Sequence, residues 1–288
     1  FAATGGDAAT ATLDRLGLGA EEVLASGKSA KHRLHALQLA GEAAALEARD
    51  AKLAHALRTR AAALAAVPRP ALPAGLRATL RPYQEEGFHF LAHLSANGFG
   101  GVLADDMGLG KTVQTLAWLL HLAQTSWSAA PAKAGRKSAQ TEAQRFRALI
   151  VCPKSVTHGW LTETERFTPT LKAVAFAPAL VRQEIAALPA ELLVVNYTQL
   201  RLHATWFQSA GWDAVVLDEG QFIKNPASQA AVVARALPAR HRVVLTGTPV
   251  ENRLTDLWSL FAFAQPGLLG SQAAFKRQHA ATDPDALA

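Results

Sequence analysis

The stretch "GGVLADDMGLGKTVQTLAWLLHLA", residues 100–123, joins a short apolar run, a turn that contains glycine, and a helical pattern. Leu116, Leu119 and Leu120 fall on one side of that helix, so we expect this side to pack on a core. An apolar strand, a glycine-bearing turn and a helix in this order place the positive end of the helix dipole beside the turn. The stretch therefore predicts an α/β fold with an anion site at the helix N-terminus.

The turn matches most of a phosphate-binding pattern. In G-x-x-x-x-G-K-[ST], backbone N–H groups hold phosphate oxygens, the lysine reaches the β and γ phosphates, and the hydroxyl binds Mg²⁺. Gly110, Lys111 and Thr112 fit this pattern, whereas Asp105 stands where its first glycine is expected. Gly108 lies inside the turn and has no side chain to keep backbone away from a phosphate. We predict that Lys111 and Thr112 contact phosphate and metal.

The composition is that of a globular, intracellular protein. The chain has 288 residues, of which 50% are hydrophobic and 18% charged, and its net charge of +6 favours an anionic partner. The single cysteine excludes an internal disulfide. The sequence has no apolar run of the ~20 residues that span a bilayer, so we expect no membrane partner. Because the chain does not begin with Met, we expect it to be part of a longer protein.

Two regions are predicted, with a boundary in "PRPALP", residues 68–73. Residues 12–67 are rich in Ala, Leu and charge, and their leucines form a helical stripe. This stripe predicts an amphipathic helix packed on a neighbour or, alternatively, a coiled-coil site for a protein partner. We therefore expect a helical region with a proline-rich linker over residues 1–72, and an α/β domain over residues 73–288.

Short β-branched runs alternate with helical patterns after the boundary, which is typical of a parallel sheet flanked by helices. The candidate strands are residues 101–104, 148–152, 192–196, 214–219 and 241–247. Residues 125–144 have no period and are predicted to form a surface loop.

An acidic pair follows one of these strands in "VVLDEGQ". An Asp at a strand end can hold Mg²⁺ through its water shell, while the adjacent Glu orients an attacking water. We assign the first role to Asp218 and the second to Glu219. No close pair of histidines occurs with cysteine at zinc-ligand spacing, so we expect no zinc site.

These motifs together resemble the Swi/Snf-family ATPases within the superfamily two helicases and translocases. The resemblance rests on "LRPYQEEGFHFL", "DDMGLGKT", "DEGQ" with "FIKNP", and "LTGTPVENRLTDLWSL", which follow the family's order. It covers about three-quarters of the chain and implies a RecA-like parallel sheet, with ATP and Mg²⁺ as cofactors. The family is similar in having an acid where the generic phosphate loop has glycine.

The resemblance also implies roles for individual residues. Gln84 would recognise the adenine edge, because an amide offers both a donor and an acceptor. Thr246 and Thr248 would couple the nucleotide site to nucleic acid, or would equally satisfy local backbone. Gln221 is expected to take part in the same coupling, because its amide can bridge a hydrogen-bond network. It replaces the histidine of the DEAH form, which argues against proton transfer there but not against hydrolysis. The residues expected to bind ATP, or to act on it, are Gln84, Gly108, Gly110, Lys111, Thr112, Asp218 and Glu219.

Contacts to double-stranded DNA are expected from "VCPKSVTHGW" and "NYTQLR", which resemble the family's nucleic-acid motifs. Lys154, Ser155, Tyr197 and Arg201 are residue types that bind phosphate without reading bases. Tyr197, and with it Trp160, is equally well explained as a packed core aromatic.

The resemblance implies a second RecA-like lobe as partner, because family members complete the ATP site with arginines from that lobe. About 25 residues after the last motif are too few to form it. The sequence thus favours the motor half of a DNA translocase that remodels protein–DNA complexes. The alternatives are a strand-separating helicase on DNA or RNA, and an ATP-switched binding module that does not move along nucleic acid.

Overall fold

The computed structural model describes residues 69–128, 146–249 and 254–279, together with the single positions 55 and 59. The helix predicted before residue 68 and most of the loop predicted at 125–144 lie outside the described residues. Positions 125–128 are described, and there the loop prediction is wrong, because helix α7 continues to Ser128. That helix is already anchored in the core along its preceding turns, so its end extends into a sequence of low helical propensity.

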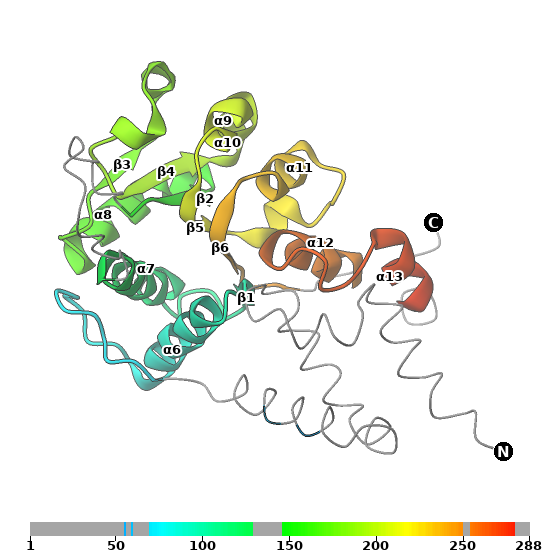
Figure 1. Cartoon of the computed structure of the whole chain (residues 1–288), viewed down its shortest axis with the longest axis horizontal. Coiled ribbons are helices and arrows are strands. Elements are labelled where there is room, and N and C mark those ends of the chain that lie inside the picture. Colours follow the sequence, from blue (N-terminus) through cyan, green and yellow to red (C-terminus); the bar gives the residue numbers. More distant parts are fainter. Residues whose placement is uncertain (1–54, 56–58, 60–68, 129–145, 250–253, 280–288) are drawn as a thin grey trace, which may run out of the picture.

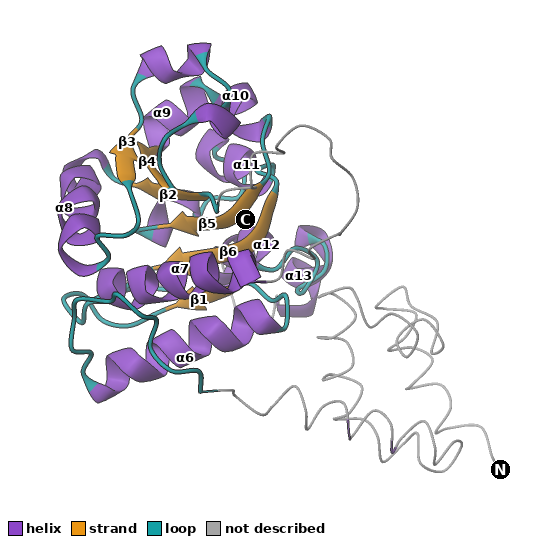
Figure 2. Ribbon diagram, turned by 60° about the vertical axis from the view of Figure 1, so that its left-hand side comes forward, coloured by secondary structure: helices purple, strands orange, loops and turns teal. Residues whose placement is uncertain are grey.

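A six-stranded parallel sheet forms the centre of the molecule, with strand order β1-β6-β5-β2-β4-β3 (Figure 2). The strands are β1 (Gly101–Leu103), β2 (Ala148–Cys152), β3 (Ala173–Ala175), β4 (Leu192–Asn196), β5 (Trp212–Leu217) and β6 (Ala239–Leu245).

Helices cover both faces of the sheet (Figure 1). The α-helices are α6 (Pro82–Ala96), α7 (Lys111–Ser128), α8 (Thr157–Phe167), α9 (Tyr197–Leu202), α10 (Ala204–Gln208), α11 (Gln229–Arg235), α12 (Leu254–Ala264) and α13 (Gln272–His279). Short 3₁₀ turns are η1 (Lys154–Val156), η2 (Pro178–Arg182), η3 (Ile185–Ala187) and η4 (Gly220–Ile223).

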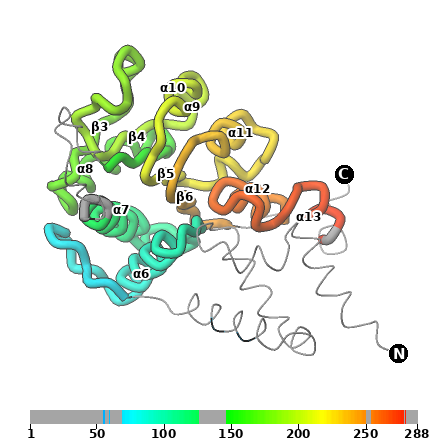
Figure 3. Tube along the Cα trace, viewed as in Figure 1, coloured from blue at the N-terminus to red at the C-terminus, as the bar shows by residue number. Residues whose placement is uncertain are grey.

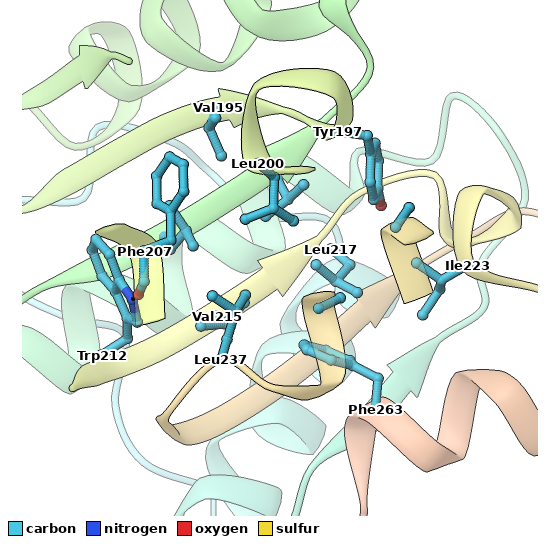
Figure 4. Close-up of a cluster of buried hydrophobic side chains, with 14 of the residues drawn as sticks. Val195, Tyr197, Leu200, Phe207, Trp212, Val215, Leu217, Ile223, Leu237 and Phe263 are labelled. Carbon is cyan, nitrogen blue, oxygen red and sulfur yellow. Dashed lines mark hydrogen bonds between the residues drawn. The ribbon is translucent and has the colours of Figure 1, made fainter. Parts of the chain in front are cut away.

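Alternate residues of the central strands supply two cores, one on each face. In β2, Leu149 and Val151 join the core beneath α9 to α12, whereas Ile150 and Cys152 join the core beneath α6 to α8. Successive side chains of a strand point to opposite faces, so a strand covered by helices on both sides must be apolar throughout. Figure 4 shows part of the first core, to which Phe207, Leu217 and Phe263 all belong.

The predicted strands are confirmed, with differences at their ends. The runs at 148–152 and 192–196 coincide with β2 and β4. β5 and β6 begin two residues earlier than predicted and end two residues earlier, so the acidic pair follows β5 instead of belonging to it. β3 was not predicted, because it is a three-residue edge strand with no buried side chain, and its run is rich in alanine, which is depleted in strands.

The chain returns to its first strand near its end (Figure 3). Helix α12 packs on β1 and β6, and the side-chain oxygen of Gln265, just after α12, accepts a hydrogen bond of 2.7 Å from the backbone N–H of Gly100. Because all strands are parallel, their carboxyl ends meet at one edge of the sheet. Residues that follow β1, β6 and β5 therefore lie side by side, and ligands bind at this edge in such sheets.

Candidate functional site

The loop between β1 and α7 has a backbone that requires glycine at two positions. Gly108 and Gly110 have φ angles of 82° and 77°, in the region that other residues seldom adopt. A Cβ atom at Gly110 would also lie 2.6 Å from the side-chain nitrogen of Gln84, which is too close. The loop leads directly into the 18-residue helix α7, so its backbone approaches the positive end of the helix dipole.

Lys111 folds over this loop. Its ammonium group donates hydrogen bonds to the carbonyl oxygens of Asp105 and Asp106, at 2.7 and 3.0 Å. The acid that replaces the first glycine of the generic pattern has a partner of its own, because the side-chain amide of Gln114 donates to the Asp105 carboxylate at 3.0 Å. Asp105 therefore ties the start of the loop to the first turn of α7. This tether explains how the loop keeps its shape without the first glycine.

Gln84 braces the same loop from helix α6. Its Nε2 donates to the carbonyl oxygen of Leu109 at 3.0 Å, and its Oε1 accepts from the backbone N–H of Arg81 at 3.0 Å. Each end of the amide keeps further hydrogen-bonding capacity, one N–H and one lone pair. Gln84 is thus positioned at the phosphate loop, with capacity left for a ligand.

Asp218 follows β5 and is partly buried, and this burial raises the pKa of its carboxyl group. The indole N–H of Trp160 donates to Oδ2 at 2.8 Å, and the backbone N–H of Glu219 donates to Oδ1 at 3.0 Å. These two donors, and the charge of Lys111, act in the opposite direction and favour the carboxylate form. Asp218 is therefore an acceptor whose two carboxylate oxygens are both held by donors.

Glu219 adopts a strained backbone conformation, with a φ of 54°. It is the only non-glycine residue with positive φ among those that the structure describes. Its carboxylate accepts a hydrogen bond of 2.9 Å from the side-chain amide of Gln221. Such strain costs on the order of 1 to 3 kcal/mol and clusters at functional sites. The left-handed conformation at Glu219 turns its side chain away from that of Asp218. The two acids were predicted to have different roles.

Thr246 and Thr248 follow β6, which lies between β1 and β5. The Thr246 side chain is buried, and its hydroxyl oxygen accepts from the backbone N–H of Thr248 at 3.1 Å. A Cβ at Gly247 would lie 3.2 Å from the side chain of Met107, so this segment touches the phosphate loop. The Lys224 ammonium donates to the Thr248 hydroxyl at 3.5 Å. The segment thus contacts both the loop after β1 and the turn after the acidic pair.

The four residues predicted to contact DNA do not share one environment. Lys154 and Ser155 are exposed in η1 after β2, and Arg201 is exposed in α9 after the neighbouring strand β4. Tyr197 differs, because it is 5% exposed and its hydroxyl donates to the carbonyl oxygen of Asp218 at 2.8 Å. Its ring stacks on Phe222, with centroids 4.8 Å apart. Tyr197 therefore supports the acidic pair from inside and presents no free hydroxyl for a phosphate.

Sequence reasoning missed Glu163 on helix α8. Burial raises the pKa of its carboxyl group. Trp160 precedes it by three residues, so both side chains project from one face of α8. An acid one turn after a buried tryptophan, in a helix that follows a central strand, was the signal available in the sequence.

The residues present fit a phosphate group with a divalent cation. Lys111 and the helix N-terminus supply positive charge, and Thr112 and Asp218 supply oxygen ligands. No group of three or more His, Cys, Asp or Glu that could hold a metal alone occurs in the described part of the chain. A cation at this place would therefore need oxygens from phosphate and water, as Mg²⁺ commonly uses.

None of the described helices is long and apolar enough to cross a membrane.

The fold and this site define a RecA-like lobe of the phosphate-loop class. The model of the SNF2-related domain matches residues 83–284, and the chain belongs to this family. Similar solved structures include the SWI2/SNF2 ATPase core of Sulfolobus solfataricus in complex with dsDNA, with 32% identity and a TM-score of 0.62, covering 73% of this chain and 40% of that one. The predicted family and fold are thereby confirmed.

Curated relatives extend the comparison. The chain is 38% identical over 210 residues to the TATA-binding protein-associated factor mot1 of Aspergillus fumigatus, covering 71% of this chain and 11% of the relative. It is 36% identical over 207 residues to the putative ATP-dependent helicase/translocase YwqA of Bacillus subtilis, covering 70% and 21% respectively. The chain thus spans a minor part of the relatives that it matches.

Proposed function

We propose that this chain is the ATP-binding half of an ATP-dependent motor that moves along double-stranded DNA and remodels protein–DNA complexes. The observation that supports it most is the meeting of Lys111 and Thr112 after β1 with Asp218 and Glu219 after β5, across the Thr246 segment after β6. The match to the SNF2-related domain, which spans residues 83–284 and so includes all these residues, also supports the proposal.

The phosphates of ATP would lie over the loop between β1 and α7. Lys111 would exchange its two carbonyl partners in the loop for phosphate oxygens, which form stronger, charge-assisted hydrogen bonds. Gly108 and Gly110 leave room for the backbone N–H groups to reach the ligand. Gln84 would use its remaining N–H and lone pair for the adenine edge.

Thr112 and Asp218 would hold Mg²⁺, the first directly and the second through water. When bound, the cation would neutralise negative charge on the phosphoryl group that is transferred. Glu219 would orient the attacking water, and Gln221 would keep the Glu219 carboxylate in place through their hydrogen bond of 2.9 Å.

DNA would bind along the exposed side of the same edge, where Lys154, Ser155 and Arg201 can contact phosphates. Thr246 and Thr248 would transmit the state of the ATP site, because their segment touches the phosphate loop and Lys224.

The intact protein would then work inside the cell, associated with DNA. A second RecA-like lobe would supply arginines that stabilise the transition state, which elsewhere contribute on the order of 10³ to 10⁵ in rate.

The test is phosphate release measured with DNA duplexes of increasing length, for residues 1–288 and for the protein with its second lobe. We expect negligible turnover by the isolated chain, and turnover that rises with duplex length in the two-lobed protein. Glu219→Gln in the two-lobed protein should bind ATP and DNA but stop turnover, because an amide orients and polarises water poorly.

Three results would contradict the proposal in different ways. Robust DNA-stimulated turnover by the isolated chain would show that the second lobe is not needed. Unwinding of duplexes at the rate of ATP turnover would indicate a strand-separating helicase. ATP-dependent binding of a protein partner without stimulation by nucleic acid would indicate a switched binding module.

A further inference from the structure

Helix α6 packs against α7 and contacts the phosphate loop between β1 and α7 (Figure 2). Gln84 donates to the carbonyl oxygen of Leu109 at 3.0 Å, near the end of the loop. Gly87 lies three residues after Gln84 and so belongs to the same face of α6. A Cβ atom at Gly87 would lie 1.8 Å from Oε1 of Gln114, in the first turn of α7. One face of α6 therefore contacts both the end of the loop and the side chain of Gln114.

The two ends of the Gln114 amide have different surroundings. The side chain is fully buried, and its Nε2 donates to the Asp105 carboxylate at 3.0 Å. Its Oε1 is buried without a hydrogen-bond partner, which costs free energy. The opposite orientation of the amide would place Oε1 beside the Asp105 carboxylate, and neither group has a hydrogen to donate. The amide thus adopts the orientation that serves Asp105.

Asp105 affects the phosphate loop through its backbone and through its charge. Its carbonyl oxygen accepts a hydrogen bond of 2.7 Å from the Lys111 ammonium, so the place of Asp105 bears on the place of the lysine. Its carboxylate would repel bound phosphates if it turned toward them. The generic pattern has a glycine at this position and therefore no side chain to control. In this chain, the hydrogen bond from Gln114 holds the carboxylate to α7.

We propose that Gln114 is a positioning residue that fixes Asp105 and so keeps the start of the phosphate loop ready for ATP, while Gly87 leaves the space that Gln114 occupies. This proposal rests on the proposed function and deepens it. Gln114 would act through Asp105 without contacting ATP. Without this tether, a smaller fraction of the molecules would have the competent loop, and the apparent affinity for ATP would fall by that fraction.

The experiment is a double-mutant cycle, in which ATP with Mg²⁺ is titrated into residues 1–288 and followed by calorimetry. Gln114→Met removes the donor but leaves a side chain of similar length. It should weaken ATP binding about tenfold or more, the size expected when a hydrogen bond to a charged group is lost. In the Asp105→Gly background, which restores the generic glycine, the same change should alter the affinity by less than about twofold. A side chain that only fills the core would not be rescued in this way.

Gly87→Ala tests the same link from helix α6, because the added methyl group would displace the Gln114 amide. It should weaken ATP binding in the wild-type background and much less in the Asp105→Gly background. Gln124→Met is the matched control, since it makes the same substitution at an exposed position of α7. It should keep the wild-type affinity for ATP. Circular dichroism checks that each variant is folded.

The proposal is overturned if Gln114→Met binds ATP as wild type does, if it loses the same affinity in both backgrounds, or if Asp105→Gly does not bind ATP. Wild-type affinity in Gly87→Ala would overturn the part assigned to Gly87. Failure of the wild-type chain to bind ATP at all would instead overturn the proposed function, so the two failures are distinguishable.

Discussion

His241 on β6 is a titratable residue that the core keeps neutral. Its side chain is 6% exposed, its ring contacts the edge of Trp118, and its Nδ1 is buried without a hydrogen-bond partner. Burial, together with the charge of Arg240, lowers the pKa of His241 from 6.5 to about 4. The folded state therefore resists protonation that the unfolded state accepts.

The sign of the pH effect follows from this difference. Between pH 6.5 and pH 4 the unfolded chain binds more protons at this position, so the free energy of unfolding falls as the pH falls. The loss from His241 alone should approach about 3 kcal/mol near pH 4. We expect urea unfolding of His241→Phe to lose less stability than wild type between pH 7 and pH 4.5. His158→Gln, which changes an exposed histidine, should behave as wild type, and equal losses in all three proteins would contradict the assignment.

Residue-scale details of the site were only partly predictable. Lys111, Thr112, Asp218 and Glu219 belong to motifs whose spacing is visible in the sequence, and the fold brings their elements to one edge. Trp160 was not predicted as a site residue, because its hydrogen bond to Asp218 depends on how α8 packs. Tyr197 was grouped with the DNA contacts, but its hydroxyl instead bonds to the Asp218 carbonyl, an interaction that no local pattern encodes.

Gly220 begins the η4 turn at the point where β6 and α12 approach the acidic pair. A Cβ at this position would lie 2.5 Å from the Val244 side chain and 3.2 Å from that of Leu260. Both are fully buried core residues, so they have little room to move. The glycine therefore permits close packing of the turn on β6.

Replacing Gly220 by alanine should overpack this contact and lower the free energy of unfolding by about 1 to 3 kcal/mol. Gly159→Ala is the control, because nothing lies within 4 Å of a Cβ at Gly159 in helix α8. That change should be neutral or stabilising, since alanine favours helix. Chemical denaturation of the two variants checks the prediction, and an unaffected Gly220→Ala protein would show that the turn can shift freely.

At the scale of elements, apolar runs predicted the buried strands well and their limits less well. β2 and β4 are buried along nearly their whole length, so pattern and strand coincide. β5 and β6 begin before the predicted apolar runs, because Trp212 already pairs with Ala239 two residues before Ala214 pairs with His241. The continuation of α7 past residue 124 extends a helix whose preceding turns are buried, and local propensity did not indicate it.

Positive charge at the carboxyl edge gives a prediction for the whole molecule. Lys154 and Arg201 are exposed after the neighbouring strands β2 and β4, whereas Lys172 is exposed at the opposite, amino end of β3. Contacts with phosphates release counterions, so binding of duplex DNA should weaken steeply with salt and depend little on sequence.

The double variant Lys154→Ala/Arg201→Ala should weaken DNA binding and lower the slope of log K against log salt by about 2, one for each lost contact. Lys172→Ala should leave both unchanged, although it also removes a positive charge. Fluorescence anisotropy of a labelled duplex at several salt concentrations measures both quantities. If all variants lose affinity equally, net charge and not the carboxyl edge determines binding.

The central claim is that the loop at Lys111 binds the phosphates of ATP, and calorimetric titration of ATP with Mg²⁺ into residues 1–288 tests it most directly. Wild type should bind, and Lys111→Ala should bind at least about tenfold more weakly, because it loses charge-assisted contacts. Lys154→Ala/Arg201→Ala should keep wild-type ATP affinity. Circular dichroism must show that Lys111→Ala is folded, since Lys111 also bonds to the loop carbonyls. Equal ATP affinity of wild type and a folded Lys111→Ala protein would contradict the account.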